Sequence, residues 1–151
     1  RVGFLGMHTI RHRLTRSAAE TQKVGRDFVQ CLSPQSLVLL RGELGAGKTV
    51  FVKGMAQGLG IHPEEVRSPT FALIHEYLRG KIPLYHMDFY RLDHWDEVIN
   101  LGFMEYLEKE GIVVIEWGDK FLPFFLPPFW VVGIQVLGEE ERDIVVQRWV
   151  E

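Results

Sequence analysis

The segment GELGAGKT, at residues 42–49, has the residue types and spacing of a phosphate-binding loop. Gly42, Gly47, Lys48 and Thr49 occupy the fixed positions of the pattern G-x-x-x-x-G-K-[ST]. In such a loop the glycines let backbone N–H groups point at phosphate oxygens, the lysine contacts the outer phosphates, and the hydroxyl binds Mg²⁺. The alternative is an ordinary glycine-rich turn with a surface lysine, because the pattern arises by chance in roughly one chain of this length per hundred.

The residues on either side of the loop favour phosphate binding. SLVLL, at 36–40, is a short apolar run of strand length, and from 48 to 59 apolar residues recur at helical spacing before Gly60. A buried strand, a loop and a helix in this order place the loop at a helix N-terminus, where anions bind. We expect the Lys48 charge to face mostly solvent in the free protein.

A magnesium ion at this loop also needs an acidic ligand on the side opposite the hydroxyl. Asp88 follows the strand-like run PLYHM, and Glu116 follows the run GIVVI. Glu116 ends the more apolar run and is the better metal candidate, whereas Asp88 would position or activate the attacking water. Each acid, taken singly, could instead be a helix cap or a surface residue. His86 is interpreted as a structural or surface residue. The alternative is that it orients the Asp88 carboxylate.

The segment RSPTF, at residues 67–71, lies where γ-phosphate-sensing segments can occur. Pro69 stiffens it, and the Thr70 hydroxyl could meet metal or phosphate. A proline turn that opens a strand is an equally favoured alternative.

The elements needed to position these residues predict an α/β fold. We expect a three-layer P-loop NTPase-like fold with a mixed, mainly parallel central sheet and antiparallel hairpins. Residues 1–151 are interpreted as one domain, with 1–14 an N-terminal extension or edge strand and 121–151 a proline-rich connection and C-terminal hairpin. The expected elements are an edge strand at 8–14, a helix at 17–32 opened by a Ser17–Glu20 capping box, strands at 36–40, 71–77, 82–88 and 112–117, a helical stretch at 93–109 interrupted at Gly102, and a hairpin of 130–137 with 143–149.

Composition limits the class of protein. The 151 residues are 46% apolar with a formal charge of −3, so the chain lacks the basic surplus of a dedicated nucleic-acid binder. Residues 121–138 carry no charge, but their prolines predict a connection into a strand rather than a membrane span. The single cysteine, Cys31, is expected to lie in the core beside Phe28, and a cytoplasmic location is the default.

Four motifs, GELGAGKT, SPTF, HMDFYRL and IEW, occur in an order and at separations that closely resemble the TsaE (YjeE) family of bacterial ATPases. The likeness covers about residues 15–117. It implies a compact P-loop (Walker A) domain that binds ATP with Mg²⁺ and hydrolyses it during synthesis of tRNA threonylcarbamoyladenosine at position 37. It also implies docking on the TsaD and TsaB proteins, whose complex would be reset or activated between turnovers, with only indirect contact to tRNA.

The resemblance also implies roles for single residues. Asp88, Glu116, Lys48 and Thr70 would be catalytic, and Thr49, Glu116 and Asp88 would surround the metal. The implied nucleotide-binding positions are Gly42, Glu43, Leu44, Gly45, Ala46, Gly47, Lys48, Thr49, Trp117, Arg142, which aligns loosely, and Thr21, near the base. Three departures from the family pattern are Val50, where many members have a hydroxyl, Glu43, where aspartate is frequent, and the aromatic run FLPFFLPPFW at 121–130, which is either core or an exposed docking patch.

Two other functions remain open. A small-molecule P-loop kinase would share the loop, although no compact basic lid segment follows it. A nucleotide-binding regulator with little hydrolysis is also compatible, because the chain shows no obvious arginine finger in cis. A GTPase is disfavoured because no Asn-Lys-x-Asp segment is present.

Overall fold

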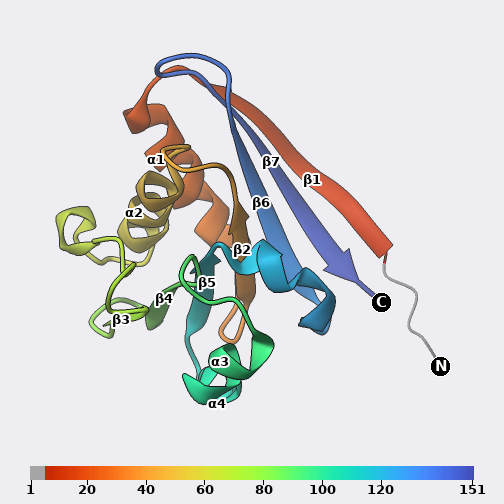
Figure 1. The fold of residues 1–151 in the computed structure, drawn as a ribbon. Helices are drawn as coiled ribbons and strands as arrows, with labels where there is room; N and C mark the ends of the chain where they lie inside the picture. Colours follow the sequence, from red (N-terminus) through yellow and green to blue (C-terminus); the bar gives the residue numbers. More distant parts are fainter. Residues whose placement is uncertain (1–5) are drawn as a thin grey trace.

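The computed structural model describes residues 6–151, which form one seven-stranded mixed sheet with helices on both faces (Figure 1). The strands are β1 (Gly6–Thr15), β2 (Leu37–Arg41), β3 (Ile74–Tyr77), β4 (Leu84–Asp88), β5 (Ile112–Glu116), β6 (Phe129–Val136) and β7 (Arg142–Val150). Their order is β1-β7-β6-β2-β5-β4-β3. The central strands β6, β2, β5 and β4 are parallel, and β1, β7 and β3 add antiparallel edges. The predicted three-layer α/β fold is confirmed.

The helices divide between the two faces of the sheet. They are α1 (Ala18–Phe28), α2 (Lys48–Gly58), α3 (Trp95–Asn100) and α4 (Phe103–Glu108), with 3₁₀ turns at Val29–Cys31, Pro63–Glu65 and Gly118–Phe124. Successive side chains of a strand point to opposite faces. In β2, Val38 and Leu40 therefore pack in the core under α1 and α2, whereas Leu37 and Leu39 pack in the core under α3, α4 and the last 3₁₀ turn.

Glycines bring α1 and α2 into unusually close contact. A Cβ built at Gly54 on α2 would lie 1.9 Å from the carbonyl oxygen of Gln22, and one at Gly25 on α1 would lie 2.3 Å from that of Phe51. These distances are far below an ordinary van der Waals contact, so no side chain fits at either position. Helix α1 therefore fixes the position of α2, whose first turn follows the phosphate-binding loop.

Two expected boundaries differ from the structure by three residues or more. The helix expected to continue to residue 32 ends at Phe28 and tightens into the 3₁₀ turn Val29–Cys31. A 3₁₀ turn has three residues per turn, so it changes the face on which later residues lie, and Cys31 is exposed rather than buried. The strand expected from residue 71 begins at Ile74, because Leu73 has a φ of 71° and Phe71 is 85% exposed in the preceding turn.

The segments near both ends of the chain follow the expectation closely. Strands β6 and β7 form the predicted hairpin, and β1 is the predicted edge strand, although residues 1–5 of the expected extension lie outside the described residues. Most of the aromatic run at 121–130 is core, since Phe121, Phe125 and Phe129 are buried, while Phe124 and Leu126 are exposed. Within residues 6–151, the structure contains no helix with the length and apolar character needed to cross a membrane.

Candidate active site

The loop at residues 42–49 joins β2 to the N-terminus of α2 and depends on its glycines. Gly45 and Gly47 have φ angles of 80° and 103°, which other residues rarely adopt. A Cβ at Gly42 would lie 2.7 Å from the carbonyl oxygen of Ile134 on β6, so the close approach of that strand requires glycine. The loop therefore presents the free N–H groups at the start of α2, as an anion-binding site requires.

Lys48 lies beneath the loop and is only 5% exposed. Its Nζ donates hydrogen bonds to the carbonyl oxygens of Gly42 and of Glu43, the latter at 3.2 Å, and lies 3.8 Å from the ring centroid of Trp117. The expectation that its charge faces solvent is wrong, because the loop and Trp117 cover it. Burial lowers the pKa of Lys48 below its ordinary value, and the nearby carboxylates, chiefly Glu116, oppose that shift.

Thr49 and Glu116, the two residues expected on opposite sides of a magnesium ion, are in direct contact. Glu116 ends β5 in register with Leu40, one residue before the end of β2, so its carboxylate reaches the first turn of α2. The Thr49 hydroxyl donates to Glu116 Oε2 at 2.9 Å. His86 Nε2 lies 2.6 Å from the same oxygen, and because a carboxylate only accepts, this nitrogen carries the hydrogen.

Asp88 lies next to Glu116, because β4 and β5 are parallel and the two acids are register partners. Asp88 Oδ2 accepts a hydrogen bond from the Thr70 hydroxyl at 3.0 Å, and Oδ1 accepts one from the N–H of Tyr90 at 2.8 Å. Thr70 also lies 2.8 Å from the Ser68 hydroxyl. The segment at 67–71 is therefore tied to the second carboxylate.

These groups line one cavity of about 400 Å³. Its lining consists of Leu44, Gly45, Ala46, Gly47, Lys48, Thr49, Val50, Ser68, Thr70, Asp88, Tyr90, Glu116 and Trp117. Trp117 adopts a left-handed backbone conformation, with a φ of 63°, immediately after Glu116. Such strained positions are concentrated at functional sites.

Arg142 and Thr21 lie beside the loop but line a neighbouring cavity of about 180 Å³. The Arg142 guanidinium donates to the carbonyl oxygens of Ala46 at 2.8 Å and Gly45 at 3.4 Å, and it also contacts carbonyls of the β6–β7 turn. Thr21 is buried, and its hydroxyl lies 2.8 Å from that of Thr15. Arg142 therefore supports the loop, and both side chains lie outside the cavity that contains the two carboxylates.

Two residues that contact the carboxylates were not identified as such from the sequence. His86 is fully buried and contacts Glu116, not Asp88, and its Nδ1 has no hydrogen-bond partner within residues 6–151. Tyr90 donates its N–H to Asp88, and its ring centroid lies 5.0 Å from that of Trp117. The one sequence signal was their position two residues before and two after Asp88 in HMDFYRL.

The oxygen atoms of the site are of the kind that Mg²⁺ takes as ligands in proteins. Within the described residues, no group of three or more His, Cys, Asp or Glu side chains could hold a metal ion. Mg²⁺ is commonly bound by one or two carboxylates together with substrate phosphates and water. Thr49, Glu116 and Asp88 supply that type of ligand around the loop.

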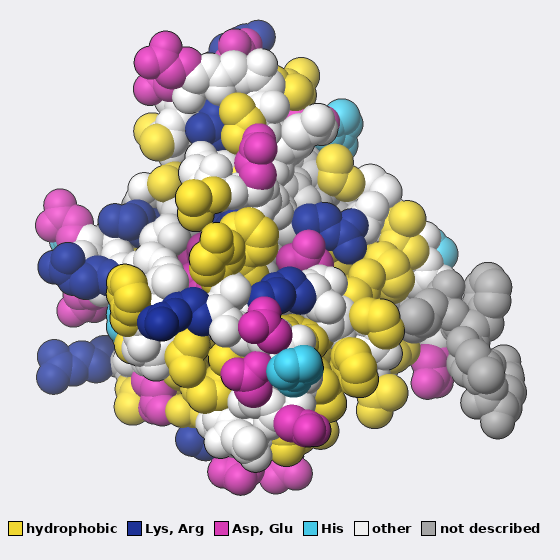
Figure 2. Space-filling model, viewed as in Figure 1, with side chains coloured by type: hydrophobic (Ala, Val, Ile, Leu, Met, Phe, Trp, Pro, Cys, Tyr) yellow, Lys and Arg dark blue, Asp and Glu magenta, His cyan; other side chains and the backbone are white. Residues whose placement is uncertain are grey.

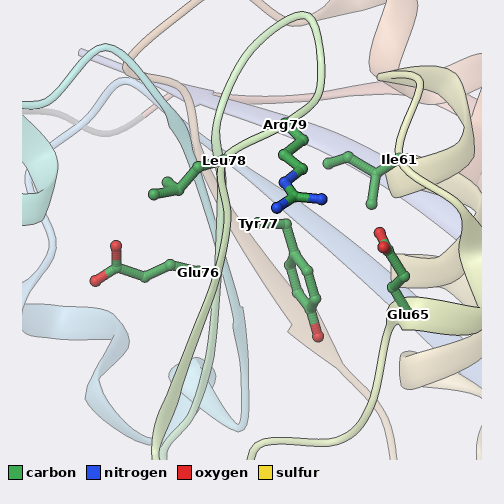
Figure 3. A pocket seen from close by; sticks show the side chains of 6 residues that line it. All are labelled: Ile61, Glu65, Glu76, Tyr77, Leu78 and Arg79. Carbon is green, nitrogen blue, oxygen red and sulfur yellow. The ribbon is translucent and has the colours of Figure 1, made fainter.

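A third hollow, of about 480 Å³, contains none of the predicted site residues. It is lined by Ile61, Glu65, Glu76, Tyr77, Leu78 and Arg79 (Figure 3). Glu76 points away from Tyr77 and Glu65 in Figure 3, and its carboxylate accepts a hydrogen bond from the Tyr106 hydroxyl at 2.6 Å. On the face of the molecule shown in Figure 2, acidic and basic side chains are interspersed, which agrees with the near-neutral composition.

Comparisons with known proteins agree on one family. The family profile described as threonylcarbamoyl adenosine biosynthesis protein TsaE matches residues 15–144. The TsaE protein of Treponema pallidum is 42% identical over 134 residues, which cover 88% of this chain and 97% of that protein. The TsaE protein of Bacillus subtilis is 39% identical over 130 residues, covering 86% and 80%. Both relatives are named as tRNA threonylcarbamoyladenosine biosynthesis proteins.

A solved structure also resembles this fold. The crystal structure of YdiB from Bacillus subtilis superposes with a TM-score of 0.74 at 31% sequence identity. The match covers 97% of this chain and 88% of the YdiB chain.

Proposed function

This chain belongs to the TsaE family, and from that premise we propose that it is the ATP-binding and ATP-hydrolysing component of tRNA threonylcarbamoyladenosine synthesis. ATP would bind with its phosphates on the loop at 42–49, and hydrolysis to ADP and phosphate would reset or activate a complex of the TsaD and TsaB proteins between turnovers. The observation that carries this proposal is the cavity in which the loop meets Glu116, Asp88 and Thr70.

The loop would bind the phosphates mainly through its backbone. The free N–H groups at the start of α2 would attract the negatively charged phosphates, and the helix dipole adds to this attraction. Lys48 is adjacent to this cradle but now donates to the carbonyls of Gly42 and Glu43. Bound phosphate oxygens would offer this ammonium a stronger, charge-assisted partner than those carbonyls.

Glu116 and Asp88 have different surroundings and are suited to different tasks. The Glu116 hydrogen bonds in the described residues all go to Oε2, so Thr49 and His86 hold that oxygen and fix the direction of the other. Thr49 and Glu116 would hold Mg²⁺, which would neutralise developing charge on the phosphates when bound. Asp88 is held at both oxygens, by Thr70 and Tyr90, so its remaining lone pairs have a fixed direction for orienting a water molecule.

The free protein should hydrolyse ATP slowly. Transfer of a phosphoryl group needs positive charge beyond the loop lysine and the metal, commonly from an arginine finger. Arg142 is the arginine bound to the loop, and its guanidinium is already engaged with backbone carbonyls. A partner protein that supplies charge, or that orders the Ser68 to Phe71 segment, would raise the rate.

ATP turnover with and without purified TsaD and TsaB proteins tests this proposal. We expect slow release of phosphate by the protein alone and faster release with both partners. Transfer of the phosphoryl group to an added small molecule would instead support a kinase. Tight ATP binding with no phosphate release under either condition would support a regulator and refute the proposed ATPase.

A further inference from the structure

We propose that Lys120 is a positioning residue for Asp88, which it holds in place through the turn at residues 89–92. This role rests on the hydrolysis proposed above, in which Asp88 orients the attacking water. Lys120 lies in the 3₁₀ turn Gly118–Phe124 that follows β5, whereas Asp88 ends β4. The interaction therefore joins the loops that follow the two acid-bearing strands.

The Lys120 ammonium is matched to three backbone acceptors. Nζ donates to the carbonyl oxygens of Phe89 at 3.1 Å and Tyr90 at 2.9 Å, and also to that of Leu92. An ammonium group has three N–H donors, so all three are used. Three carbonyl dipoles that converge on one point repel each other, and the positive charge removes that repulsion.

The turn held by Lys120 contacts the Asp88 carboxylate directly. The N–H of Tyr90 donates to Asp88 Oδ1 at 2.8 Å, and the N–H of Phe89 donates to the carbonyl oxygen of Glu116 at 3.0 Å. Within the turn, the N–H of Leu92 donates to the carbonyl oxygen of Phe89 at 3.0 Å. If the turn opened, Asp88 would lose the donor that fixes Oδ1 and would be held at Oδ2 alone, by Thr70, so its orientation would be less well defined.

The test replaces Lys120 with methionine, which keeps most of the aliphatic stem and removes the charge and the donors. The matched control is Lys23→Met on the exposed surface of α1. Amide hydrogen exchange of Tyr90 reports directly on the turn, without any need for ATP. Steady-state ATP hydrolysis with the activating partners then separates kcat from KM.

We expect Lys120→Met to speed exchange at Tyr90 and to lower kcat by about 10- to 100-fold, since small misplacement of a catalytic group has effects of this order. KM for ATP should change less than about twofold because the loop is untouched. Lys120→Arg, which keeps charged donors, should restore part of both losses and serves as the second variant if Lys120→Met fails to fold. Lys23→Met should match the wild-type protein.

Two results would overturn the inference. Unchanged exchange at Tyr90 in Lys120→Met would show that the ammonium does not hold the turn. Faster exchange with an unchanged kcat would show that the turn does not position Asp88. If the wild-type protein hydrolysed no ATP, the proposed function would fail, while the exchange measurement would still decide whether Lys120 holds the turn.

Discussion

At the scale of single residues, Lys48 meets two opposing demands. The proposed phosphate binding requires its positive charge, but burial disfavours that charge and lowers its pKa below the ordinary 10.5. The folded protein therefore binds this proton less readily than the unfolded chain does. The charged lysine lowers stability at neutral pH, and this cost disappears as pH rises through the lowered pKa toward 10.5.

Replacement of Lys48 by methionine should separate the two demands. We expect Lys48→Met to weaken ATP binding by about 10- to 100-fold, the size of a lost hydrogen bond to a charged group. Its free energy of unfolding should equal or exceed that of the wild-type protein at pH 7, with the difference shrinking as pH rises. Calorimetric titration and denaturant unfolding measure the two quantities. Equal ATP affinity in variant and wild type would refute the phosphate-binding role of Lys48.

The two carboxylates should respond differently to neutralisation. Glu116→Gln should weaken Mg²⁺-dependent ATP binding more than Asp88→Asn does. The reason is that the Glu116 carboxylate accepts a hydrogen bond from the Thr49 hydroxyl at the start of α2, so these two proposed metal ligands lie together. Asp88→Asn should bind ATP but hydrolyse it about 100-fold more slowly, as for loss of a positioned general base. ATP titrations with and without Mg²⁺, followed by turnover assays, distinguish the variants. The opposite pattern would exchange the assigned roles.

The members of the candidate site were easier to propose from the sequence than their contacts. The loop could be identified because its chemistry depends on local spacing, and the acids because each ends an apolar strand. The partner of His86 could not, since it depends on how β4 lies against β5, where His86 reaches Glu116 across the strand pair. Burial of Lys48 was missed for the same reason: Trp117, which covers it, is distant in sequence.

At the scale of elements, the contact between α1 and α2 is sensitive to volume. Gly54→Ala would force a methyl group to within 1.9 Å of the Gln22 carbonyl oxygen unless the helices separate. We expect a loss of about 1–3 kcal/mol in the free energy of unfolding, the usual cost of overpacking, despite the better helix propensity of alanine. Gly133→Ala on β6 is the matched control, because nothing lies within 4 Å of its Cβ position. A Gly54→Ala protein as stable as this control would contradict the close packing.

The start of α3 gives a pH-dependent prediction. The Glu97 carboxylate accepts hydrogen bonds from the N–H groups of Asp93 at 2.9 Å and His94 at 3.0 Å, and these lower its pKa below 4.5. A carboxylate with a lowered pKa stabilises the fold above its ordinary pKa, and this contribution is lost as pH falls through the folded value.

Glu97→Gln should therefore reduce the melting temperature at pH 7, and the difference from wild type should shrink below about pH 4. Glu105→Gln, in the first turn of α4, is the control for removal of an exposed negative charge near a helix start. Thermal unfolding by circular dichroism at several pH values makes the comparison. A Glu97→Gln difference that is constant from pH 7 to pH 3 would show that the hydrogen-bonded charge does not contribute.

Element types were easier to predict than element ends. The type follows from periodicity, which extends over many residues, as in the helical stretch that Gly102 divides into α3 and α4. An end depends on local backbone geometry, and the left-handed Leu73 that delays β3 has no counterpart in the apolar pattern of FALIHEY. The exposed Phe71 is a consequence of that turn.

At the scale of the whole molecule, the site forms where three parallel strands end. Strands β2, β5 and β4 are neighbours in the sheet, and their C-terminal ends lead to the loop, to Glu116 and to Asp88. Ligands of open α/β sheets bind outside the carboxyl ends of parallel strands. The antiparallel strands on one side support this arrangement, since Arg142 at the start of β7 holds the loop carbonyls.

This architecture leaves the cavity that contains Glu116 and Asp88 open to solvent and beside exposed apolar side chains. Leu44 and Tyr90, which line the cavity, are 80% and 51% exposed, and Phe71 lies next to Thr70 in the chain. A partner that covered this region would exclude water from the phosphates and could order the segment at 67–71. The ATPase and the transfer of threonylcarbamoyl groups would then be coupled through one surface.

Multiple-turnover threonylcarbamoyl transfer to tRNA, in a purified system with TsaD and TsaB proteins, tests that coupling. If ATP hydrolysis resets the complex, Lys48→Met, Asp88→Asn and Glu116→Gln should each permit about one round of transfer and then stop. Gly133→Ala should sustain many rounds, because it lies outside the cavity and leaves the loop intact. A first round of normal size in the site variants would show that the partners themselves are active. Sustained transfer by Lys48→Met at the wild-type rate would refute the resetting role, whatever its affinity for ATP.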